Sequence, residues 1–243
     1  RREAEGGFLE VSDEIGAENY WPWGLSVGDV NADGFDDAFL ASSMCFPYRY
    51  AANSLLLNQA GERWVDSEFA LRVEPRPAGK RIRPWFVLDL DGEDQGNELG
   101  RDRTGRVVVW STLGSRSSAL LDIDGDGDLD LITNDFNSPP QLLVSDLAQR
   151  HSVHWLQVRL EGDSANRDGL GAVVRLEASG ATQWKRHDGQ SGYLAQSSMP
   201  LYFGLGAAEQ VDRIEVTWPG GQTQTLDGPI PANQILHIKQ QQP

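Results

Sequence analysis

The segment DIDGDGDLD, residues 122–130, places five aspartates on alternate positions with no basic residue among them. Two carboxylates about 4–5 Å apart repel by roughly 1 kcal/mol even in bulk water, and by more where water is partly excluded. A folded chain that crowds these groups needs something to offset the repulsion. The same plan, D-x-[ND]-x-D-G-x-x-D, recurs at residues 29–37, and in both copies one apolar run precedes the loop and another follows it. Any fold for this chain has to accommodate that repeat.

The repeated loop carries the donor set of a hard-cation site. Positions 1, 3 and 5 point side-chain oxygens into one hollow, and the glycine at position 6 permits the sharp turn that closes it. A carbonyl at position 7 and a carboxylate at position 9 complete a cage of oxygens, which suits Ca²⁺. We expect about two Ca²⁺, and the predicted ligands are Asp29, Asn31, Asp33, the Phe35 carbonyl and Asp37 in one loop, and Asp122, Asp124, Asp126, the Asp128 carbonyl and Asp130 in the other.

The loop differs from an EF-hand, because position 12 is Leu40 or Thr133 instead of Glu and both flanks resemble strands. An acidic β-turn without metal is the alternative, since Asp, Asn and Gly favour turns for local reasons. A degraded third copy spans residues 85–102 with one inserted residue. It would hold a third Ca²⁺, and its weaker candidate ligands are Asp89, Asp91, Glu93 and Glu98.

Short apolar runs alternate with clusters of Gly, Asp, Asn and Pro, which is typical of all-β proteins. A helical turn is expected only at residues 145–149. The Asp loops stop before residue 150, so we predict a domain boundary near 148–153 that divides the chain into 1–150 and 151–243. The predicted strands cover residues 25–30, 37–42, 54–58, 63–66, 85–90, 106–111, 119–123, 129–133, 141–145, 155–160, 172–178, 182–187, 201–205, 211–218 and 235–238.

Composition excludes several functions. Acidic residues outnumber basic ones by 36 to 21, giving a formal net charge of −15, which argues against nucleic acid and against an anionic membrane surface. No apolar run is long enough for membrane insertion. The single cysteine, Cys45, rules out an intrachain disulfide and is expected to be a small buried apolar side chain. Common hydrolase, zinc and phosphate-binding motifs are missing, so we expect no enzymatic activity.

Two stretches of the chain resemble known families. Residues 20–148 are similar to FG-GAP repeats, also called VCBS-type repeats, through WPWGLSVGDVNADGFDDAFLAS and ALLDIDGDGDLDLITNDF. Residues 151–240 resemble an ASPIC/UnbV domain through HWLQVRLEGDSANRDGLGAVVRLEASG, DGQSGYLAQSSMPLYFGLG and VDRIEVTWPGGQTQTL. Blades followed by this domain are the layout of the cartilage acidic protein-like family.

This resemblance implies propeller-type blades, here a partial β-propeller, followed by a β-sandwich. It implies a calcium-binding protein that is secreted, periplasmic or at the cell surface and acts in adhesion or assembly. A closed propeller of this kind has about seven blades, whereas two or three units are visible here. We therefore expect a protein partner or a second chain that completes the propeller and covers its sheet edges. Because the chain begins with Arg1 and shows no signal peptide, we expect a mature or trimmed form.

Two other functions stay open. A carbohydrate-binding or sugar-acting protein would need exposed aromatic side chains beside polar groups in a concave pocket, and a structural subunit of a larger complex would need neither. The loop SANRDGLGA and nearby strand ends form a possible binding loop for protein or glycan. The favoured alternative is a plain hairpin, in which Gly169 and Gly171 adopt positive φ while Arg167 and Asp168 pin the turn. The candidate residues of the binding loop are Asn166, Arg167, Asp168, His187 and Tyr193.

Overall fold

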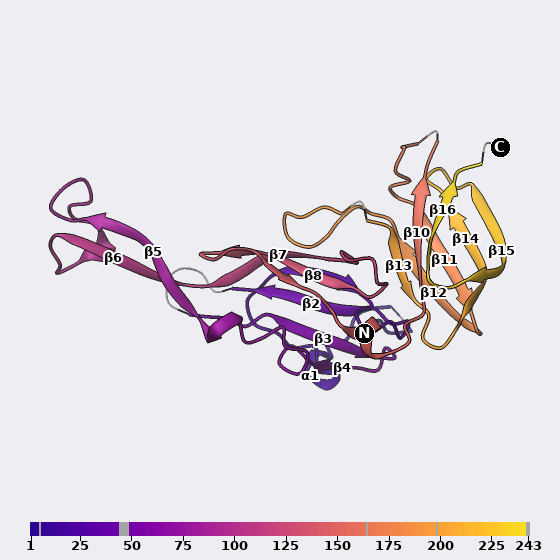
Figure 1. Ribbon diagram of the computed structural model, residues 1–243, viewed down its shortest axis with the longest axis horizontal. Coiled ribbons are helices and arrows are strands. Elements are labelled where there is room, and N and C mark those ends of the chain that lie inside the picture. The colour runs from indigo at the N-terminus through magenta and orange to yellow at the C-terminus, as the bar shows by residue number, and fades with distance from the viewer. Residues whose placement is uncertain (5, 44–48, 164, 198, 242–243) are drawn as a thin grey trace.

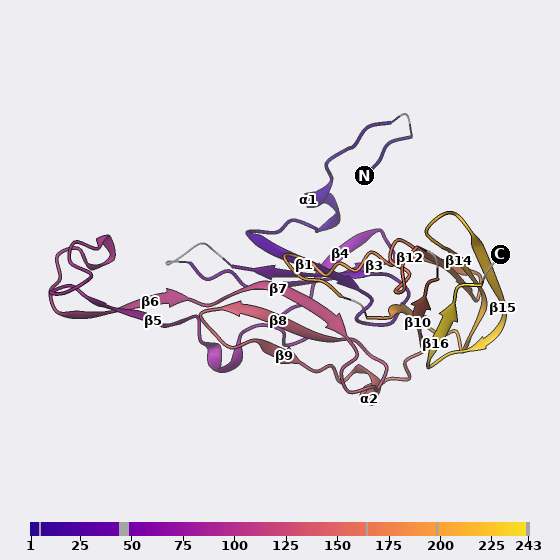
Figure 2. The ribbon, with the colours of Figure 1, turned by 90° about the horizontal axis from the view of Figure 1, so that it is seen from above.

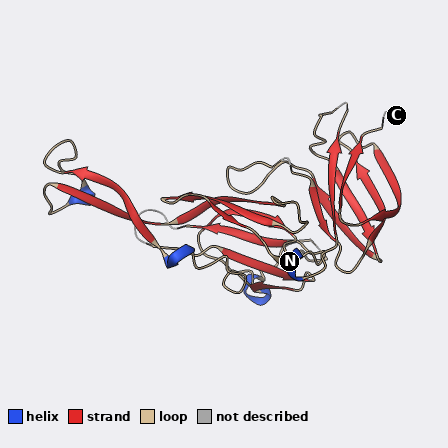
Figure 3. Ribbon diagram, in the orientation of Figure 1, coloured by secondary structure: helices blue, strands red, loops and turns tan. Residues whose placement is uncertain are grey.

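The computed structural model describes residues 1–4, 6–43, 49–163, 165–197 and 199–241, and Cys45 lies outside them. The described chain is built almost entirely of β-strands, so the all-β prediction is confirmed (Figure 3). The molecule is extended, with a two-stranded ribbon at one end, the other N-terminal sheets in the middle and the C-terminal strands at the opposite end (Figure 1).

The strands of the first half are β1 (Pro22–Gly28), β2 (Asp37–Ser42), β3 (Ser54–Gln59), β4 (Arg63–Asp66), β5 (Ile82–Asp89), β6 (Arg106–Thr112), β7 (Gly114–Leu121), β8 (Asp130–Phe136) and β9 (Gln141–Leu143). Those of the second half are β10 (Trp155–Glu161), β11 (Val173–Ala178), β12 (Ala181–Arg186), β13 (Leu201–Gly204), β14 (Gln210–Thr217), β15 (Thr223–Pro231) and β16 (Gln234–Lys239). The helical segments are α1 (Ser12–Ile15), η1 (Pro77–Gly79), η2 (Glu98–Gly100) and α2 (Leu147–Arg150). Every predicted strand overlaps an observed one, and the predicted helical turn overlaps α2.

Two antiparallel sheets form the body of the N-terminal half. The orders β1-β2-β3-β4 and β7-β8-β9 follow the sequence, as in the blades of a propeller. Strand β1 lies beside β7, where the Ser26 hydroxyl donates to the Ser118 carbonyl at 2.9 Å. Alternate residues of β1 are buried, as expected of a strand with one face toward a core. A hydrophobic cluster of this half contains Phe39, Ala41 and Leu131.

Each full Asp loop connects two antiparallel strands. Gly28 pairs with Asp37 at the end of the β1–β2 hairpin, and Leu121 pairs with Asp130 at the end of the β7–β8 hairpin. The predicted strand–loop–strand repeat is therefore confirmed, and the loops sit at the ends of neighbouring hairpins.

The degraded third copy forms the ribbon β5–β6, which projects from the body in two perpendicular views (Figures 1 and 2). One face of the ribbon packs Leu88 and Val109 into a small cluster of its own. The opposite face exposes Val87, Val108 and Trp110. The backbone amide of Leu113 donates to the Arg81 carbonyl at 2.9 Å and closes the base of the ribbon.

The second half is a β-sandwich, as the family resemblance implies. The sheets β13-β10-β16 and β12-β11-β14-β15 enclose the largest hydrophobic cluster of the described residues. Its largest fully buried side chains include Trp218, Phe203, Leu156 and Leu176. Strand β10 is central in its sheet and pairs in parallel with β16.

Strand β15 is missing from the sequence prediction. It contains the pair Gly228–Pro229, which is typical of a turn. The structure tolerates this proline because β15 is an edge strand. The register with β14 shifts between Val211 and Arg213, opposite this pair.

In the described part of the chain, every helix is too short or too polar to cross a lipid bilayer.

Candidate metal centre

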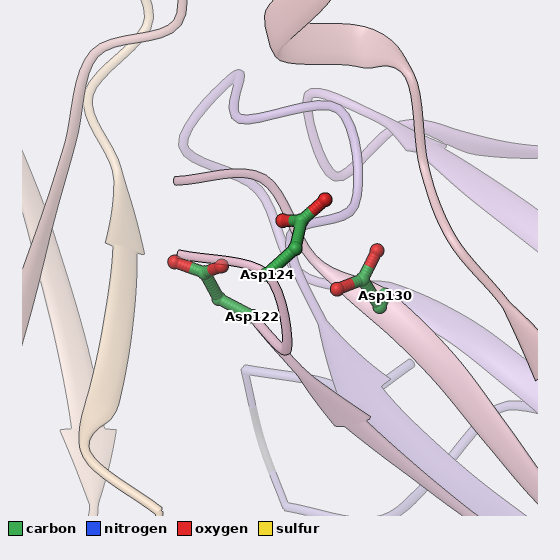
Figure 4. Close-up of side chains that lie close together, drawn as sticks. All are labelled: Asp122, Asp124 and Asp130. Carbon is green, nitrogen blue, oxygen red and sulfur yellow. The ribbon is translucent and has the colours of Figure 1, made fainter. Parts of the chain in front are cut away.

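The second Asp loop gathers three carboxylates at the tip of the β7–β8 hairpin (Figure 4). Asp122 and Asp124 lie in the loop, and Asp130 is the first residue of β8. Each offers a carboxylate oxygen, and these oxygens all lie within 4.8 Å of one another. This cluster could hold a metal ion. It brings together three of the five predicted ligands of this loop.

Backbone amides fix the positions of these carboxylates. Asp130 accepts hydrogen bonds from the amides of Ile123 at 2.7 Å and Ser145 at 2.8 Å. Asp122 accepts from the amide of Gly125 at 2.8 Å. The loop turns back on itself through Gly125 and Gly127, which both have positive φ. These hydrogen bonds and the turn hold the three carboxylates of the cluster in place.

The remaining aspartates of this loop carry unused oxygens. Asp128 is 1% exposed, and its Oδ2 accepts from the amide of Ala148 at 2.8 Å. Its Oδ1 and the Oδ2 of Asp126 are buried atoms without a hydrogen-bond partner. Buried acceptors of this kind are costly unless a donor or a cation satisfies them. The donor set therefore fits a hard cation such as Ca²⁺.

The pKa shifts of the loop carboxyl groups also favour a bound cation. Burial, followed by the charge of Asp126, raises the pKa of Asp122. Burial also raises the pKa of Asp128, again with Asp126 as a contributing charge. Both shifts mean that the ionised loop is unfavourable without a counter-charge. A divalent cation supplies that counter-charge.

The first Asp loop is more enclosed and arranged differently. Asp29 accepts from the amides of Asp33 at 3.0 Å and Gly34 at 2.7 Å, while Asp37 accepts from the amides of Val30 at 2.9 Å and Asn58 at 2.8 Å. Burial raises the pKa of Asp29 to about 7 and that of Asp37 to about 6.

In this loop the predicted ligands do not all converge. Asp33 turns toward its own loop, because its carboxylate accepts from the Asn31 side chain at 3.0 Å and from the amide of Phe35 at 2.9 Å. Across residues 29–37, all of which are described, no three carboxylates come as close together as in the second loop. Cation binding by this loop, including ligation by the Phe35 carbonyl, stays a prediction.

The third copy forms no acidic cluster among the described residues. Asp89, Asp91, Glu93 and Glu98 are all exposed. The inserted segment instead folds through Asp94, whose carboxylate accepts from the amide of Asp89 at 2.8 Å. Sequence reasoning missed Asp94, because the position of an insertion inside a loop leaves no periodic signal.

The candidate residues of the possible binding loop in the second half do not form one site, because they make different contacts. Asn166 pins the turn, since its side chain donates to the Leu170 carbonyl at 2.8 Å and accepts from the Leu170 amide at 2.7 Å. His187 and Asp168 line a small cavity of about 160 Å³, and burial lowers the pKa of His187. Tyr193 packs edge-on against Trp23 of the N-terminal half, with ring centroids 5.5 Å apart. Gly169 and Gly171 have positive φ, as the hairpin alternative predicts, but the side chain that holds the turn is Asn166 and not the predicted Arg167 or Asp168.

A larger cavity of about 550 Å³ lies between β1 and β7 on one side and β12 with the following loop on the other. Its lining includes Trp184, which is 61% exposed, beside Lys185, Asp188 and Gln190. Arg175 lies over the Trp184 ring at 5.4 Å from the centroid. The site therefore combines an exposed aromatic ring with polar groups in a concave surface.

Residues of the C-terminal sheet contact both Asp loops, and no sequence signal identifies them. Gln157 of β10 donates to Asp122, and Tyr202 of β13 donates to the carbonyl of Gly127. Gly204 of β13 lies against Asp29. Such contacts join segments far apart in the chain, so local patterning cannot predict them.

Comparison with known proteins matches residues 162–243 to the family ASPIC and UnbV. The chain is 38% identical to Cartilage acidic protein 1 of Xenopus tropicalis over 269 residues, which cover 98% of this chain and 40% of that protein. Cartilage acidic protein 1 of Mus musculus is 39% identical and that of Homo sapiens 38% identical, each over 106 residues that cover 42% of this chain and 16% of the relative. The chain thus spans well under half the length of these relatives. The predicted resemblance to cartilage acidic protein-like proteins with an ASPIC/UnbV domain is confirmed.

Proposed function

We propose that this chain, which resembles Cartilage acidic protein 1 along nearly its whole length and carries an ASPIC and UnbV domain, is a calcium-binding interaction or assembly module without enzymatic activity. The observation that carries the proposal is the acidic cluster of Asp122, Asp124 and Asp130, whose carboxylate oxygens lie within 4.8 Å of one another. Converging carboxylates and carbonyls are the ligands that Ca²⁺ prefers.

The cation would have a structural role. Bound calcium supplies positive charge that links the carboxylates of a loop to each other. Asp122 and Asp130 flank the ends of β7 and β8, so their shared ion would fasten the two strands together. A ligand that binds only the folded state stabilises that state, by about 2.7 kcal/mol at a free concentration 100 times the Kd.

We propose an extracellular location, which the resemblance to FG-GAP and ASPIC/UnbV proteins implies. The relatives' name refers to cartilage, which agrees with that placement. Free calcium outside cells is high enough to fill sites of modest affinity, with Kd of about 10⁻⁴–10⁻³ M. Two loops of this kind would therefore be loaded continuously and would act as structural parts of the protein.

A protein partner is the second element of the proposal. The ribbon β5–β6 has two unpaired strand edges and exposes Val87, Val108 and Trp110 on one face. Exposed edges and apolar faces of this kind favour association with another chain. A second chain or another protein that adds strands to the ribbon would complete a blade. A subunit of a larger complex would copurify with such a chain, whereas a free-standing adhesin would not.

The experiment is a thermal melt in EDTA and in millimolar Ca²⁺, with bound metal counted in parallel. We expect a rise of several degrees in Tm and about two calcium ions per chain. The variant Asp122→Asn with Asp124→Asn should lose one ion and part of the shift. Asp227→Asn removes a carboxylate from the exposed edge strand β15, outside the Asp loops, and should behave as the wild type. No bound calcium and no shift in Tm would refute the calcium assignment.

Carbohydrate binding is a second candidate, favoured by the cavity of about 550 Å³ lined by Trp184. An exposed indole beside Lys185, Asp188 and Gln190 offers a stacking surface and hydrogen-bonding groups for a small polar ligand. A glycan array probed with the wild type and with Trp184→Ala tests carbohydrate binding, and signals that the variant loses would support it. Signals that the variant retains, or an array without signals, would speak against this candidate.

A further inference from the structure

Both Asp loops lie against one sheet of the C-terminal sandwich. Strands β10 and β13 are neighbours in this sheet, and each presents residues to the loops. The contacts fall on polar atoms of the loops themselves.

The second loop is held by two buried polar side chains. The Tyr202 hydroxyl donates to the Gly127 carbonyl at 2.9 Å, and the Gln157 amide donates to Oδ2 of Asp122 at 3.2 Å. Tyr202 is 8% exposed and Gln157 is 6% exposed, so both donor side chains are buried, whereas the acceptor Asp122 is half-buried. Gly127 lies between Asp126 and Asp128, and a Cβ there would meet Nε1 of Trp155 at 1.8 Å. The glycine that closes the loop also lets the C-terminal sheet approach it.

The first loop is held by the end of β13. A Cβ on Gly204 would lie 2.0 Å from Oδ2 of Asp29 and 2.6 Å from Cα of Ala32. The amide of Gly206 donates to the Ala32 carbonyl at 2.9 Å. Lys185 of β12 forms an ion pair with Asp36 of the same loop. The backbone of the C-terminal half therefore fits directly onto this loop.

We propose that the two cation sites are composite: the loops supply the ligands, and Tyr202, Gln157 and Gly204 position the loops for the cation. The inference rests on the proposed function, that the loops bind calcium. Tyr202 fixes the peptide between two candidate ligands, and Gln157 orients Asp122. Gly204 provides the space in which Asp29 can keep its position. All three are positioning residues.

The coupling works in both directions. If the C-terminal sheet raises the affinity of a loop for calcium, calcium strengthens the docking of that sheet on the loops by the same factor. Calcium would then set the relative placement of the two halves as well as the stability of each hairpin. Metal removal would loosen β10 and β13 more than the remote strands β14 and β15.

The test is a calcium titration by calorimetry on the whole chain. Tyr202→Phe removes one hydroxyl and should weaken one of the two sites about fivefold, which corresponds to one hydrogen bond. Gly204→Ala should weaken the other site, because its methyl group displaces Asp29. Tyr193→Phe is the matched control: Tyr193 also contacts the N-terminal half, but through its ring against Trp23, and this variant should bind as the wild type.

The outcomes separate this inference from the proposed function. A wild type that binds no calcium refutes the proposed function and, with it, the inference. A wild type that binds two ions, with unchanged affinities in Tyr202→Phe and Gly204→Ala, overturns the inference alone. If a variant fails to fold, hydrogen exchange on the wild type decides. Calcium should slow exchange in β10 and β13 and leave β14 and β15 unchanged, and equal effects in all four strands would contradict a composite site.

Discussion

A buried ion pair connects two separate segments of the N-terminal half. Arg76 precedes η1 and Asp135 lies in β8, and their side chains are 3% and 0% exposed at a distance of 2.5 Å. Ser115 of β7 donates to Asp135 at 2.8 Å and accepts from Arg76 at 2.8 Å. The pair therefore fixes the base of the ribbon against the β7–β8 hairpin. Breaking a buried pair leaves one charge uncompensated, which is far more costly than losing an exposed pair.

We predict that Asp135→Asn lowers the free energy of unfolding by about 3–5 kcal/mol. The exposed pair of Arg150 and Asp146, also at 2.5 Å, supplies the control. Asp146→Asn should cost less than about 1 kcal/mol, because water screens that pair. Urea unfolding in saturating calcium measures both. Similar losses in the two variants would show that burial of Arg76 and Asp135 adds nothing.

For single residues, the sequence predicts the candidate metal ligands better than it predicts the residues that contact them. Asp122, Asp124 and Asp130 follow from spacing alone, because a turn with glycine at position 6 brings alternate side chains together. Asp33 follows the same spacing, yet its carboxylate is taken by groups of its own loop. Tyr202 and Gln157 were beyond prediction, since their importance depends on which sheet the loops meet.

At the scale of elements, β15 shows how a strand can contradict its own sequence pattern. Gly228 sits where the register with β14 shifts, and a Cβ there would lie 2.3 Å from the Val211 carbonyl and 2.7 Å from that of Asp212. The backbones approach so closely that only glycine fits. The Gly–Pro pair that suggests a turn is therefore part of the strand pairing.

We predict that Gly228→Ala destabilises the protein by about 1–3 kcal/mol, because the methyl group forces the β14 and β15 backbones apart. Thr225→Ala on the exposed side of β15 should stay within about 0.5 kcal/mol of the wild type. Thermal melts of the two variants give the comparison. An unchanged Tm for Gly228→Ala would contradict this prediction, because β15 could then move away from β14 without loss of stability.

The other strands were predictable because alternation is a local property. Residues of β11 and β14 alternate between buried and more exposed positions, and their apolar side chains mark the strands directly. The residues at which strands begin and end were predicted less accurately. Strand β7 begins at Gly114 in place of the expected residue 119, because the segment GSRSS, residues 114–118, carries no apolar signal although it pairs with β8.

For the whole molecule, the ribbon β5–β6 is the part least supported by the rest. It has its own small cluster of buried residues, and a two-stranded sheet is at best marginally stable in water. Its base is closed by the hydrogen bond between Leu113 and Arg81. The body should therefore fold without it.

We predict that replacing residues 82–112 with an Asn-Gly turn leaves Tm within a few degrees of the wild type. If the proposed partner adds strands to the ribbon, the same deletion should abolish that association. Light scattering and copurification measure the association, and a variant that associates like the wild type would place the contact elsewhere. A collapse in Tm would instead show that the ribbon supports the body.

The sequence indicates the sandwich and the blades separately, but it does not indicate how they meet. The repeated Asp loops of the first half and the ASPIC and UnbV match of the second half are local patterns, whereas Lys185–Asp36 and Tyr193–Trp23 join residues more than a hundred positions apart. The boundary near residues 148–153 stays a prediction. It falls in the connection from α2 to β10, across which no strand pairs between the two halves in the described part of the chain.

The parallel pairing of β10 with β16 has a consequence for biosynthesis. The ribosome delivers Leu156 long before Gln234, its partner in the sheet. Until residues 234–239 emerge, β10 lacks one neighbour and the sandwich core stays open on that side. Contacts between such distant residues also make folding slow. The C-terminal half should therefore fold only after its synthesis is nearly finished, and in the interval its nascent strands would be a natural substrate for chaperones.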